Sequence, residues 1–430
     1  MTLNTRHLPI SLLYVAIMSW IYLTEIVVYW AYMGFRGAFT PAGFALCMGI
    51  AVVTSALIPS TRDTRVAILT CMHYLCFLPT TIFLAYSSAS IEHYAAFAIL
   101  WGSLTFLSAL PMRALVIASL KTKYILTIVF AAIILVLTIQ VAFGGLNYFN
   151  LNIERVYEFR TEAASNLPPI FGYVYSNVAS VLVPLALVLS FKFRAYWLVA
   201  LALGCSIMLF GMTAHKSVLF TPPAVALLYV FFVRMKSPQM IGYFFMAAPA
   251  LCGLELLYLH FIDEYFGPGY INSLIARRLL FVPTMLDGLY IDFFSINPQY
   301  YWSTSRIGGW AAENPYGIAA PFLIGSEYFS DTEMSANTGV IGSGYSNAGL
   351  IGVAIYSALC GLLLALLNAY GRRIGHALVT AVSLSTIFNV VTTTDLVTAI
   401  LTHGLLLLLL MLAVFPMLAA SRPVPIGARA

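Results

Sequence analysis

Charged side chains are scarce in this 430-residue chain: Lys, Arg, Asp and Glu make up 9 % of it, whereas 61 % is hydrophobic and the mean hydropathy is +0.92. A soluble globule carries about 25 % charged residues, because its surface must be hydrated. The scarcity therefore excludes soluble enzymes, nucleic-acid-binding proteins and secreted disulfide scaffolds. It predicts an all-α polytopic membrane protein, since long apolar helices satisfy their own backbone groups in lipid.

Several catalytic and metal-binding motifs are also absent. The six cysteines lie in apolar runs without a Cys-x-x-Cys pair, and the spacing of Cys71, His73 and Cys76 distributes them around a helix, which favours core packing over a metal site. The sequence contains no P-loop, no Gly-x-Ser-x-Gly nucleophile motif and no His, Asp and Glu set with metal-ligand spacing. We therefore expect neither ATP hydrolysis nor a metal or other cofactor.

Apolar runs of 16 to 23 residues predict twelve membrane-spanning helices, because about 20 apolar residues cross the hydrocarbon layer. We expect one membrane domain, residues 1–430, without an internal repeat. The first span is too long for the apolar part of a signal peptide, so we expect it to remain as an anchor. The predicted spans lie near residues 10–32, 41–58, 66–86, 94–110, 124–143, 171–191, 196–212, 217–233, 239–260, 347–369, 376–392 and 397–418.

The basic residues indicate the orientation of these spans. If the N-terminus is cytoplasmic, most Lys and Arg residues, such as Arg62, Lys121 and Arg372, fall in cytoplasmic segments, and Asp63 is the only acidic residue there. Cytoplasmic loops of membrane proteins are enriched in Lys and Arg. The pattern therefore predicts that both termini of the chain are cytoplasmic.

Two predicted outer loops are large enough to have a function, residues 144–170 and residues 261–346. The second loop is rich in aromatic residues, including Tyr300, Tyr301 and Trp302. Aromatic rings stack on sugars and carboxylates accept hydrogen bonds from hydroxyl groups, so the set favours a glycan ligand. The alternative is that the rings form the core of the loop or an interfacial belt. The second loop also holds half of the acidic residues: Asp263, Glu264, Asp287, Asp292, Glu313, Glu327, Asp331 and Glu333.

Adjacent arginines, Arg277 and Arg278, are the sharpest local signal in the larger loop. Guanidinium groups bind phosphate oxygens through two parallel hydrogen bonds, which makes this pair a candidate phosphate site. Contacts with lipid headgroups or surface ion pairs are equally compatible with it. Arg155, Arg160 and Lys216 would add positive charge for a diphosphate, although Glu154, Glu158 and Glu162 stand at helical spacing from the two arginines and favour salt bridges within a helix.

Two glutamates, Glu25 and Glu255, fall within predicted spans. An ionisable residue inside a membrane span is a functional candidate, here for proton transfer. Because both lie near the outer ends of their spans, hydrogen bonding or snorkelling explains them more simply. His73, His376 and His403 are interpreted as packing residues or residues at helix ends.

An ordered run of motifs in the larger loop resembles the bacterial O-antigen polymerases of the Wzy type. The segment from Arg277 to Gly288 resembles the Arg-x10-Gly segment of that family, and the likeness continues through Tyr300-Tyr301 and residues 323–329, 334–339 and 344–352. It covers residues 270–352 well and the rest of the chain mainly through topology. His215-Lys216 resembles a Gln-Lys of related chains. The smaller loop departs from the family, since Asn166 stands where a second Arg-x10-Gly beginning at Arg155 requires glycine.

The resemblance implies a metal-independent glycosyltransferase of the C type in the bacterial inner membrane. Such an enzyme moves a growing glycan from undecaprenyl diphosphate to a newly flipped, lipid-linked repeat unit at the periplasmic face. A flippase and a chain-length regulator would be its partners. It also implies roles for particular residues. Arg277 and Arg278, helped by Arg155, Arg160 and Lys216, would bind the diphosphate; Glu327 or, second, Asp331 would accept the proton of the acceptor hydroxyl; Asn337 and Tyr345 would orient sugars.

Other functions remain open at this point. An O-antigen ligase is one, although ligases typically carry a histidine before the tenth span and this chain has none between residues 261 and 375. A twelve-helix transporter or a flippase for lipid-linked glycan is another. It would line a central cavity with polar groups, for which only Glu25 and Glu255 are candidates. A mannosyltransferase-type enzyme would usually show an acidic motif in the first outer loop, and residues 32–38 contain none.

Overall fold

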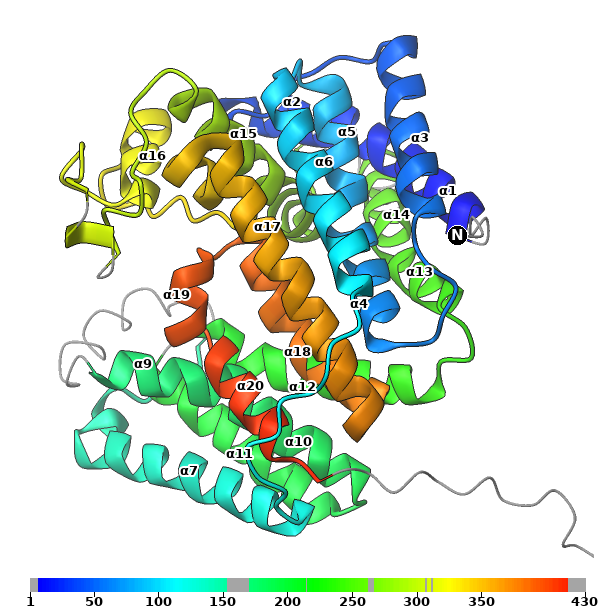
Figure 1. Cartoon of the computed structure of the whole chain (residues 1–430). Coiled ribbons are helices and arrows are strands. Elements are labelled where there is room, and N and C mark those ends of the chain that lie inside the picture. The colour runs from blue at the N-terminus through cyan, green and yellow to red at the C-terminus, as the bar shows by residue number, and fades with distance from the viewer. Residues whose placement is uncertain are drawn as a thin grey trace, which may run out of the picture. The chain divides into compact units, whose positions relative to one another are not determined.

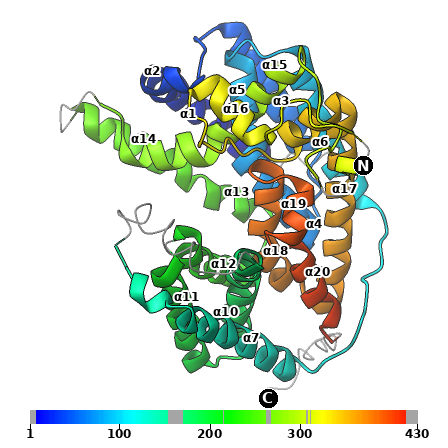
Figure 2. The same cartoon turned by 90° about the vertical axis from the view of Figure 1, so that its left-hand side faces the viewer.

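The computed structural model describes residues 7–152, 170–213, 215–261, 267–305, 308–310 and 312–416 (Figures 1 and 2). Helices make up 77 % of the structure, and the described residues contain no strand. The prediction of an all-α membrane protein is thereby confirmed as a fold class. Membrane character follows from the length and composition of the helices, several of which are apolar over their whole length.

Eight helical segments in the described part of the chain are long and apolar enough to cross a bilayer. Each coincides with one of the twelve predicted spans. Their bounds are Leu8–Met33, Thr64–Tyr86, Thr122–Ala142, Tyr173–Lys192, Tyr196–Thr213, Lys216–Arg234, Gln239–Phe261 and Val340–Ile374.

The other four predicted spans are shorter or broken. Pro41–Ala56, Ile91–Phe106 and His376–Thr392 are helices of 16, 16 and 17 residues. The last predicted span, 397–418, is divided into Leu396–Leu401 and Leu405–Val414. The division falls at Gly404, which has a φ of 85° and packs so closely on Val181 and Ser180 that no side chain fits there. Sequence hydropathy does not detect such a break, because the flanking residues stay apolar.

The chain divides into two compact units. Unit 1 comprises Met1–Leu110, Met235–Ala365 and Ile387–Ala399. Its complete helices are α1 (Leu8–Ile21), η2 (Tyr22–Ile26), α2 (Val27–Trp30), η3 (Ala31–Met33), α3 (Pro41–Ala56), α4 (Thr64–Met72), η4 (His73–Phe77), α5 (Leu78–Tyr86), α6 (Ile91–Phe106), η5 (Leu107–Ala109), α13 (Gln239–Phe245), α14 (Ala247–Phe261), η8 (Asn272–Phe281), α15 (Val282–Phe294), η9 (Gly308–Trp310) and α16 (Ala320–Phe329).

Unit 2 comprises Pro111–Arg234, Leu366–Thr386 and Ile400–Ala430. Three helices contribute residues to both units: α17 (Val340–Ile374), α18 (His376–Thr392) and the short α19 (Leu396–Leu401). The helices that lie wholly in unit 2 are α7 (Thr122–Ala142), η6 (Gly145–Tyr148), α9 (Ile170–Asn177), η7 (Val178–Leu182), α10 (Val183–Lys192), α11 (Tyr196–Thr213), α12 (Lys216–Arg234) and α20 (Leu405–Val414).

Polar residues fix where several helices of unit 1 begin. The side chains of Thr40, Asp63 and Ser90 accept hydrogen bonds from backbone amides in the first turns of α3, α4 and α6, at 3.0, 2.9 and 3.3 Å. These bonds satisfy amides that have no partner within the helix. Pro41 follows Thr40 at the first helical position, where a missing N–H costs nothing.

An aromatic cluster centred on Tyr22 forms the part of the unit 1 core that supports η8. Its ring contacts Phe35, Phe83, Tyr86 and Phe281, with centroids 4.8 to 6.4 Å apart. Tyr22 is fully buried, as are Phe35 and Phe281. The cluster packs the start of α15 and the end of η8 against α5 and η2.

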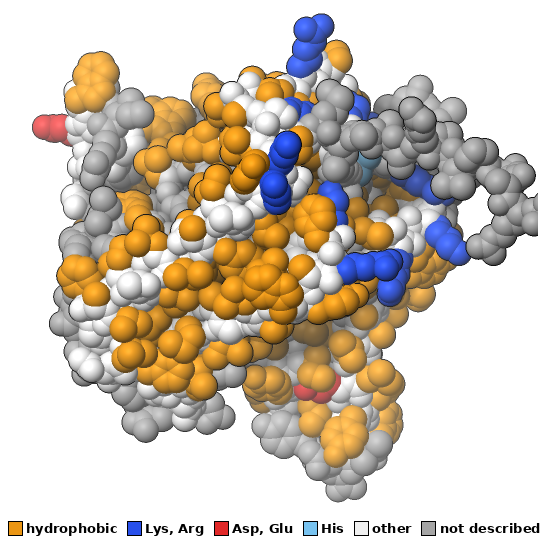
Figure 3. All heavy atoms as spheres, turned by 90° about the horizontal axis from the view of Figure 1, so that it is seen from below, with side chains coloured by type: hydrophobic (Ala, Val, Ile, Leu, Met, Phe, Trp, Pro, Cys, Tyr) orange, Lys and Arg blue, Asp and Glu red, His pale blue; other side chains and the backbone are white. Residues whose placement is uncertain are grey.

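Hydrophobic side chains also cover much of the surface. On the face drawn in Figure 3 they form broad areas, and the Lys and Arg side chains gather toward one side. In α7, α12 and Gln239–Phe261, only 33 %, 28 % and 28 % of the most apolar window is buried. Apolar surface of this extent on long helices fits contact with lipid.

Candidate active site

Most of the acidic and basic residues of the predicted larger loop lie at one end of unit 1, which we call the polar end (residues 31–40, 86–93, 267–294 and 320–349). Contacts join its segments to each other: Arg277 to Met33, Arg36 to Asp292, and Asp287 to Thr338. The predicted loop is therefore not a separate domain. Its first half is built into the helices of unit 1.

Two buried or half-buried glutamates hold the start of η8. Glu25 accepts a hydrogen bond from the Gly269 amide at 2.7 Å, and Glu255 accepts bonds from the amides of Ile271 and Asn272 at 2.7 and 2.6 Å. Asn272 Nδ2 also donates to Glu255 at 2.9 Å. Carboxylates are favourable at the positive end of a helix. The geometry gives both intramembrane glutamates a role in fixing η8.

Arg277 and Arg278 project from η8 into different surroundings. The Arg277 guanidinium is half-buried, lies 5.0 Å from the centre of the Trp30 ring and donates to Ser273 Oγ at 2.7 Å. Burial and the neighbouring charge of Arg278 lower the pKa of Arg277. Arg278 is exposed and makes no hydrogen bond or ion pair with the rest of the described chain. One guanidinium is thus held in place and the other is available to an anion.

A further arginine, Arg36, lies at the polar end and was not among the site residues predicted from sequence. Its guanidinium is 3.3 Å from the Asp292 carboxylate on α15, and its carbonyl accepts a bond from Tyr22 at 2.8 Å. Glu327 and Tyr328 on α16 are close to this pair: burial and the charges of Asp292 and Glu327 raise the pKa of Tyr328, and Arg36 lowers it. The sequence did offer a signal for Arg36, because a basic residue in a predicted short outer loop goes against the usual charge bias of such loops.

Two of the predicted carboxylates differ in availability. Glu327 is exposed and has no hydrogen-bond or ion-pair partner among the residues that the structure describes. Asp331 is also exposed, but its Oδ1 accepts bonds from the amides of Glu333 and Met334 at 2.9 and 3.1 Å and so closes a turn. The exposed Asn337 side chain accepts a bond from Ser335 at 3.1 Å.

Tyr345, near the start of α17, is buried, and its hydroxyl donates to the carboxylate of Glu92 at the start of α6. Glu92 was not predicted as a site residue. No sequence signal joins two residues separated by 253 positions. The contact places a half-buried carboxylate at the polar end and occupies the tyrosine hydroxyl.

The glycine-rich motif at residues 344–352 forms a sharp break in α17. Ala348 and Gly349 have non-helical backbone angles, and the φ of 57° and ψ of −144° at Gly349 suit only glycine. Gly344 and Gly352 then pack backbone against backbone, so that a side chain on either would overlap the other. The motif that resembles the polymerase family therefore has a structural reason in this chain.

Asp287 is the buried acid of the polar end. Its Oδ1 accepts bonds from Thr338 Oγ1 at 2.5 Å and from the Gly342 amide at 3.0 Å, and so caps the start of α17. Burial raises the pKa of Asp287 to about 7, and the two hydrogen bonds lower it in part. Beside it lies a cavity with about 20 Å³ of room for water, lined also by Thr284 and Cys76. In the sequence, Asp287 could have been recognised as a candidate because it stands among the largely apolar residues 279–294.

Several aromatic side chains of the predicted larger loop form its core. Tyr290, Phe294 and Tyr300 are buried, and the rings of Phe294, Tyr300 and Tyr316 lie 5.2 to 6.1 Å apart. Tyr300 donates to the Ile318 carbonyl at 3.0 Å and Tyr316 to the Pro298 carbonyl at 2.6 Å. These rings are satisfied within the protein. Tyr301 and Trp310 remain largely exposed, at 59 and 83 %.

The remaining predicted site residues are Arg155, Arg160 and Lys216. Arg155 and Arg160 lie outside the described residues. Lys216 begins α12 and belongs to unit 2, whereas Arg277, Arg278, Glu327, Asp331, Asn337 and Tyr345 belong to unit 1.

The polar end combines exposed guanidinium groups with carboxylates of several degrees of burial. Such a set can bind an anion and accept a proton. Among the described residues, no group of three His, Cys, Asp or Glu side chains is arranged to hold a metal ion. Comparisons of this chain with known protein families, curated proteins and solved structures found no match.

Proposed function

We propose that this protein is a glycosyltransferase that polymerises undecaprenyl-diphosphate-linked oligosaccharide repeat units at the periplasmic face of the bacterial inner membrane. The main support is the pair Arg277–Arg278 on a helix that buried carboxylates fix. One guanidinium is packed on Trp30 and the next is exposed without a protein partner. This arrangement suits an anionic leaving group that is bound transiently, as a diphosphate is.

The reaction needs no cofactor. The acceptor hydroxyl oxygen attacks the anomeric carbon of the donor glycan and forms the new glycosidic bond. The bond between that carbon and the diphosphate oxygen breaks, and undecaprenyl diphosphate leaves with the electron pair. Arg277 and Arg278 stabilise the charge that develops on the diphosphate. A carboxylate accepts the proton of the hydroxyl.

Glu327 is the carboxylate that we assign to this proton transfer, because it is exposed and unpaired in the described chain whereas Asp331 closes a turn. Asn337 is exposed and can contact sugar hydroxyls. Tyr345 would act through Glu92, which it holds.

The proposal includes the membrane arrangement. α3, α6, α18 and the pair α19–α20 would complete twelve crossings, with both termini in the cytoplasm and the polar end in the periplasm. Thin bilayers and flanking polar residues accommodate helices of 16 or 17 residues. A flippase would instead need Glu25 and Glu255 as cavity-lining groups, and both carboxylates are bound to the backbone of residues 269–272.

The test is chain growth by variants of Arg278. In a deletion strain, Arg278→Ala should leave core with a single repeat unit and no ladder on a gel of surface glycan. With purified protein and lipid-linked repeat units, the rate should fall by about 100-fold or more. Arg278→Lys should recover part of the rate, because it keeps the charge but loses the planar pair of donors.

The matched control is Arg62→Ala. It removes an exposed arginine that lies between α3 and α4, outside the polar end. It should support a normal ladder. All variants are compared at equal abundance and equal Tm. Normal chain length with Arg278→Ala would contradict the diphosphate assignment. Loss of every repeat unit in the deletion strain would favour a ligase or flippase, and an unchanged ladder would favour a transporter of another substrate.

A further inference from the structure

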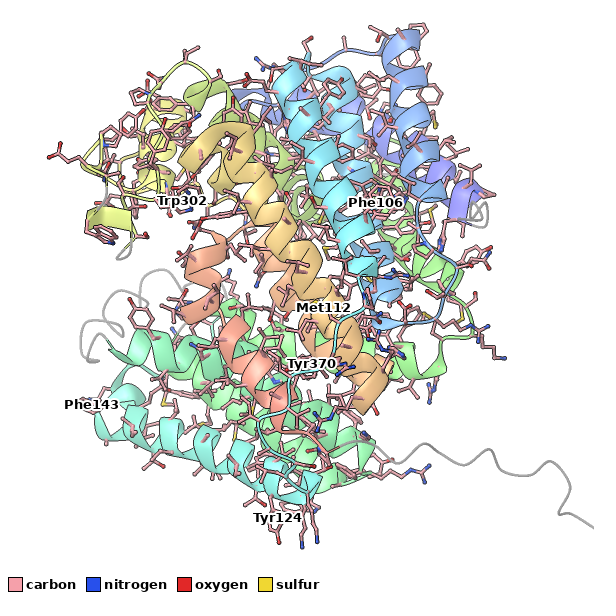
Figure 4. All side chains as sticks on the ribbon, in the orientation of Figure 1. Phe106, Met112, Tyr124, Phe143, Trp302 and Tyr370 are labelled. Atoms are coloured by element: carbon pink, nitrogen blue, oxygen red, sulfur yellow. The ribbon has the colours of Figure 1, made fainter. Side chains whose placement is uncertain are left out.

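The segment Gln299–Trp302 is bound to the break in α17. The amides of Tyr300 and Tyr301 donate to the carbonyls of Ser346 and Asn347, each at 2.9 Å, and the Trp302 amide donates to Asn347 Oδ1 at 2.9 Å. These carbonyls lack helical partners because α17 breaks at Ala348 and Gly349. Figure 4 labels Trp302, where this segment meets the start of α17. The segment is therefore held rigidly by a structural irregularity.

Two consecutive residues of this segment have a left-handed backbone. The φ angles are 48° at Tyr301 and 60° at Trp302. Residues with bulky side chains rarely adopt this conformation, and glycine or asparagine would adopt it with less strain. Such strain persists only where surrounding contacts impose it, and it is concentrated at functional sites. Trp302 contributes one such contact, since its Nε1 donates to Tyr356 at 2.9 Å and Tyr356 donates to Asp395 at 2.9 Å.

The strained conformation presents the Tyr301 ring to solvent. Tyr301 is 59 % exposed, whereas Tyr300 before it is 1 % exposed. Within the described part of the chain, the Tyr301 ring packs on no other ring and its hydroxyl makes no hydrogen bond. Packing therefore does not explain why a tyrosine occupies this strained position.

The side-chain amide of Gln299 lies two residues before the Tyr301 ring in the same segment. The half-buried side chain of Gln299 lies against Gly349, with Nε2 only 2.9 Å from where a Cβ of residue 349 would be, and it makes no hydrogen bond with the other described residues. An exposed ring stacks on the apolar face of a pyranose, and an amide binds its hydroxyl groups through both a donor and an acceptor. A lipid-interface tyrosine would need neither a fixed backbone nor an adjacent amide.

We propose that Tyr301 and Gln299 form a subsite for a pyranose of the glycan, remote from the diphosphate. α15 separates this segment from Arg278, and its 13 residues span about 20 Å. The subsite would hold a sugar distant from the reacting bond and so affect affinity for glycan more than the rate of transfer. The inference rests on the proposed function for the identity of the ligand.

The experiment measures binding of oligosaccharide released by mild acid from the lipid-linked repeat units of the deletion strain. Full-length protein in detergent is titrated by NMR. Tyr301→Gly relieves the backbone strain and removes the ring, so its Tm should be equal to or above that of the unsubstituted protein while Kd rises about two- to ten-fold. Tyr301→Phe should bind normally. Tyr196→Ala, which removes an equally exposed ring in unit 2, should also bind normally.

In the polymerisation assay, Tyr301→Gly should raise KM for the acceptor and leave kcat within about two-fold. Unchanged Kd and KM would overturn the subsite, as would a loss of kcat alone. A defect seen in bilayers but absent in detergent would overturn it in favour of an interfacial ring. If the unsubstituted protein fails to polymerise repeat units, the proposed function fails, yet a Tyr301-dependent Kd would still support the subsite.

Discussion

The two units satisfy free backbone groups, in helix ends or loops, with side chains of opposite charge. In unit 1, carboxylates accept hydrogen bonds from amides at or near helix starts: Asp63 for α4, Glu255 for η8, Asp287 for α17 and Asp395 for α19. The described residues of unit 2 contain no Asp or Glu. There, Arg372 and Arg373 donate to the carbonyls of Met112 and Phe415, each at 2.8 Å.

This difference restricts where chemistry can occur. A helix start attracts negative groups and a helix end attracts positive groups, so both solutions are favourable in low-dielectric surroundings. Only unit 1 leaves carboxylates beyond those required for structure, such as Glu327. A reaction that requires a carboxylate of the described chain as its proton acceptor must therefore use unit 1.

Removal of the Glu255 carboxylate should have the largest effect on stability. Glu255→Leu leaves the amides of Ile271 and Asn272 without their acceptor, whereas Asn272 Nδ2 keeps its bond to the Cys252 carbonyl. Each donor that loses its partner here costs about 1–3 kcal/mol, so the free energy of unfolding should fall by at least about 2 kcal/mol. Thermal unfolding in detergent measures the change.

The matched variant in unit 2 is Arg372→Gln, which removes one exposed bond to the Met112 carbonyl. It should cost about 1 kcal/mol or less. Equal losses for Arg372→Gln and Glu255→Leu would contradict the view that buried carboxylates fix η8.

Asp287 should make unit 1 sensitive to pH. Its pKa of about 7 in the folded chain lies above its ordinary value of 3.8, so the protonated acid favours the folded state. Its contribution to stability is fully present below pH 4 and is lost as the pH rises to 7. Asp287→Asn, which keeps an acceptor for Thr338 and Gly342, should abolish this part of the pH dependence of Tm. An unchanged slope in that variant would show that another group titrates.

The ion pair between Arg36 and Asp292 should contribute least to stability. The two side chains are 62 and 40 % exposed, and exposed pairs contribute about 0–1 kcal/mol. Asp292→Asn should leave Tm unchanged within error at both low and high salt. A salt-dependent loss of several degrees would instead identify the pair as a structural link between the 31–40 segment and α15.

Local patterns predicted the elements better than the contacts between them. Apolar runs located all eight long helices, because the length of an apolar run can be read directly from the composition of the chain. The break at Gly404 was missed, since it depends on the packing of Val181 and Ser180 from elsewhere in the chain.

The site shows the same limit. Arg277 and Arg278 stand out in the sequence by adjacency, but nothing local shows that Trp30 holds the first and leaves the second free. Glu92 contacts Tyr345, 253 residues away, and Glu25 acts on Gly269, 244 residues away. Partners of buried polar groups are set by the tertiary fold, so a sequence pattern identifies the group and leaves its role open.

The ten-residue π-helix η8 also constrains how this segment can evolve. In a π-helix each hydrogen bond spans one residue more than in an α-helix, so η8 accommodates an extra residue between Asn272 and Phe281. Loss of one residue there would restore an α-helix and turn the preceding residues by about 100° relative to α15. Arg277 would leave Trp30. Across descendants of this chain, the length of residues 272–281 should therefore vary less than their side chains do.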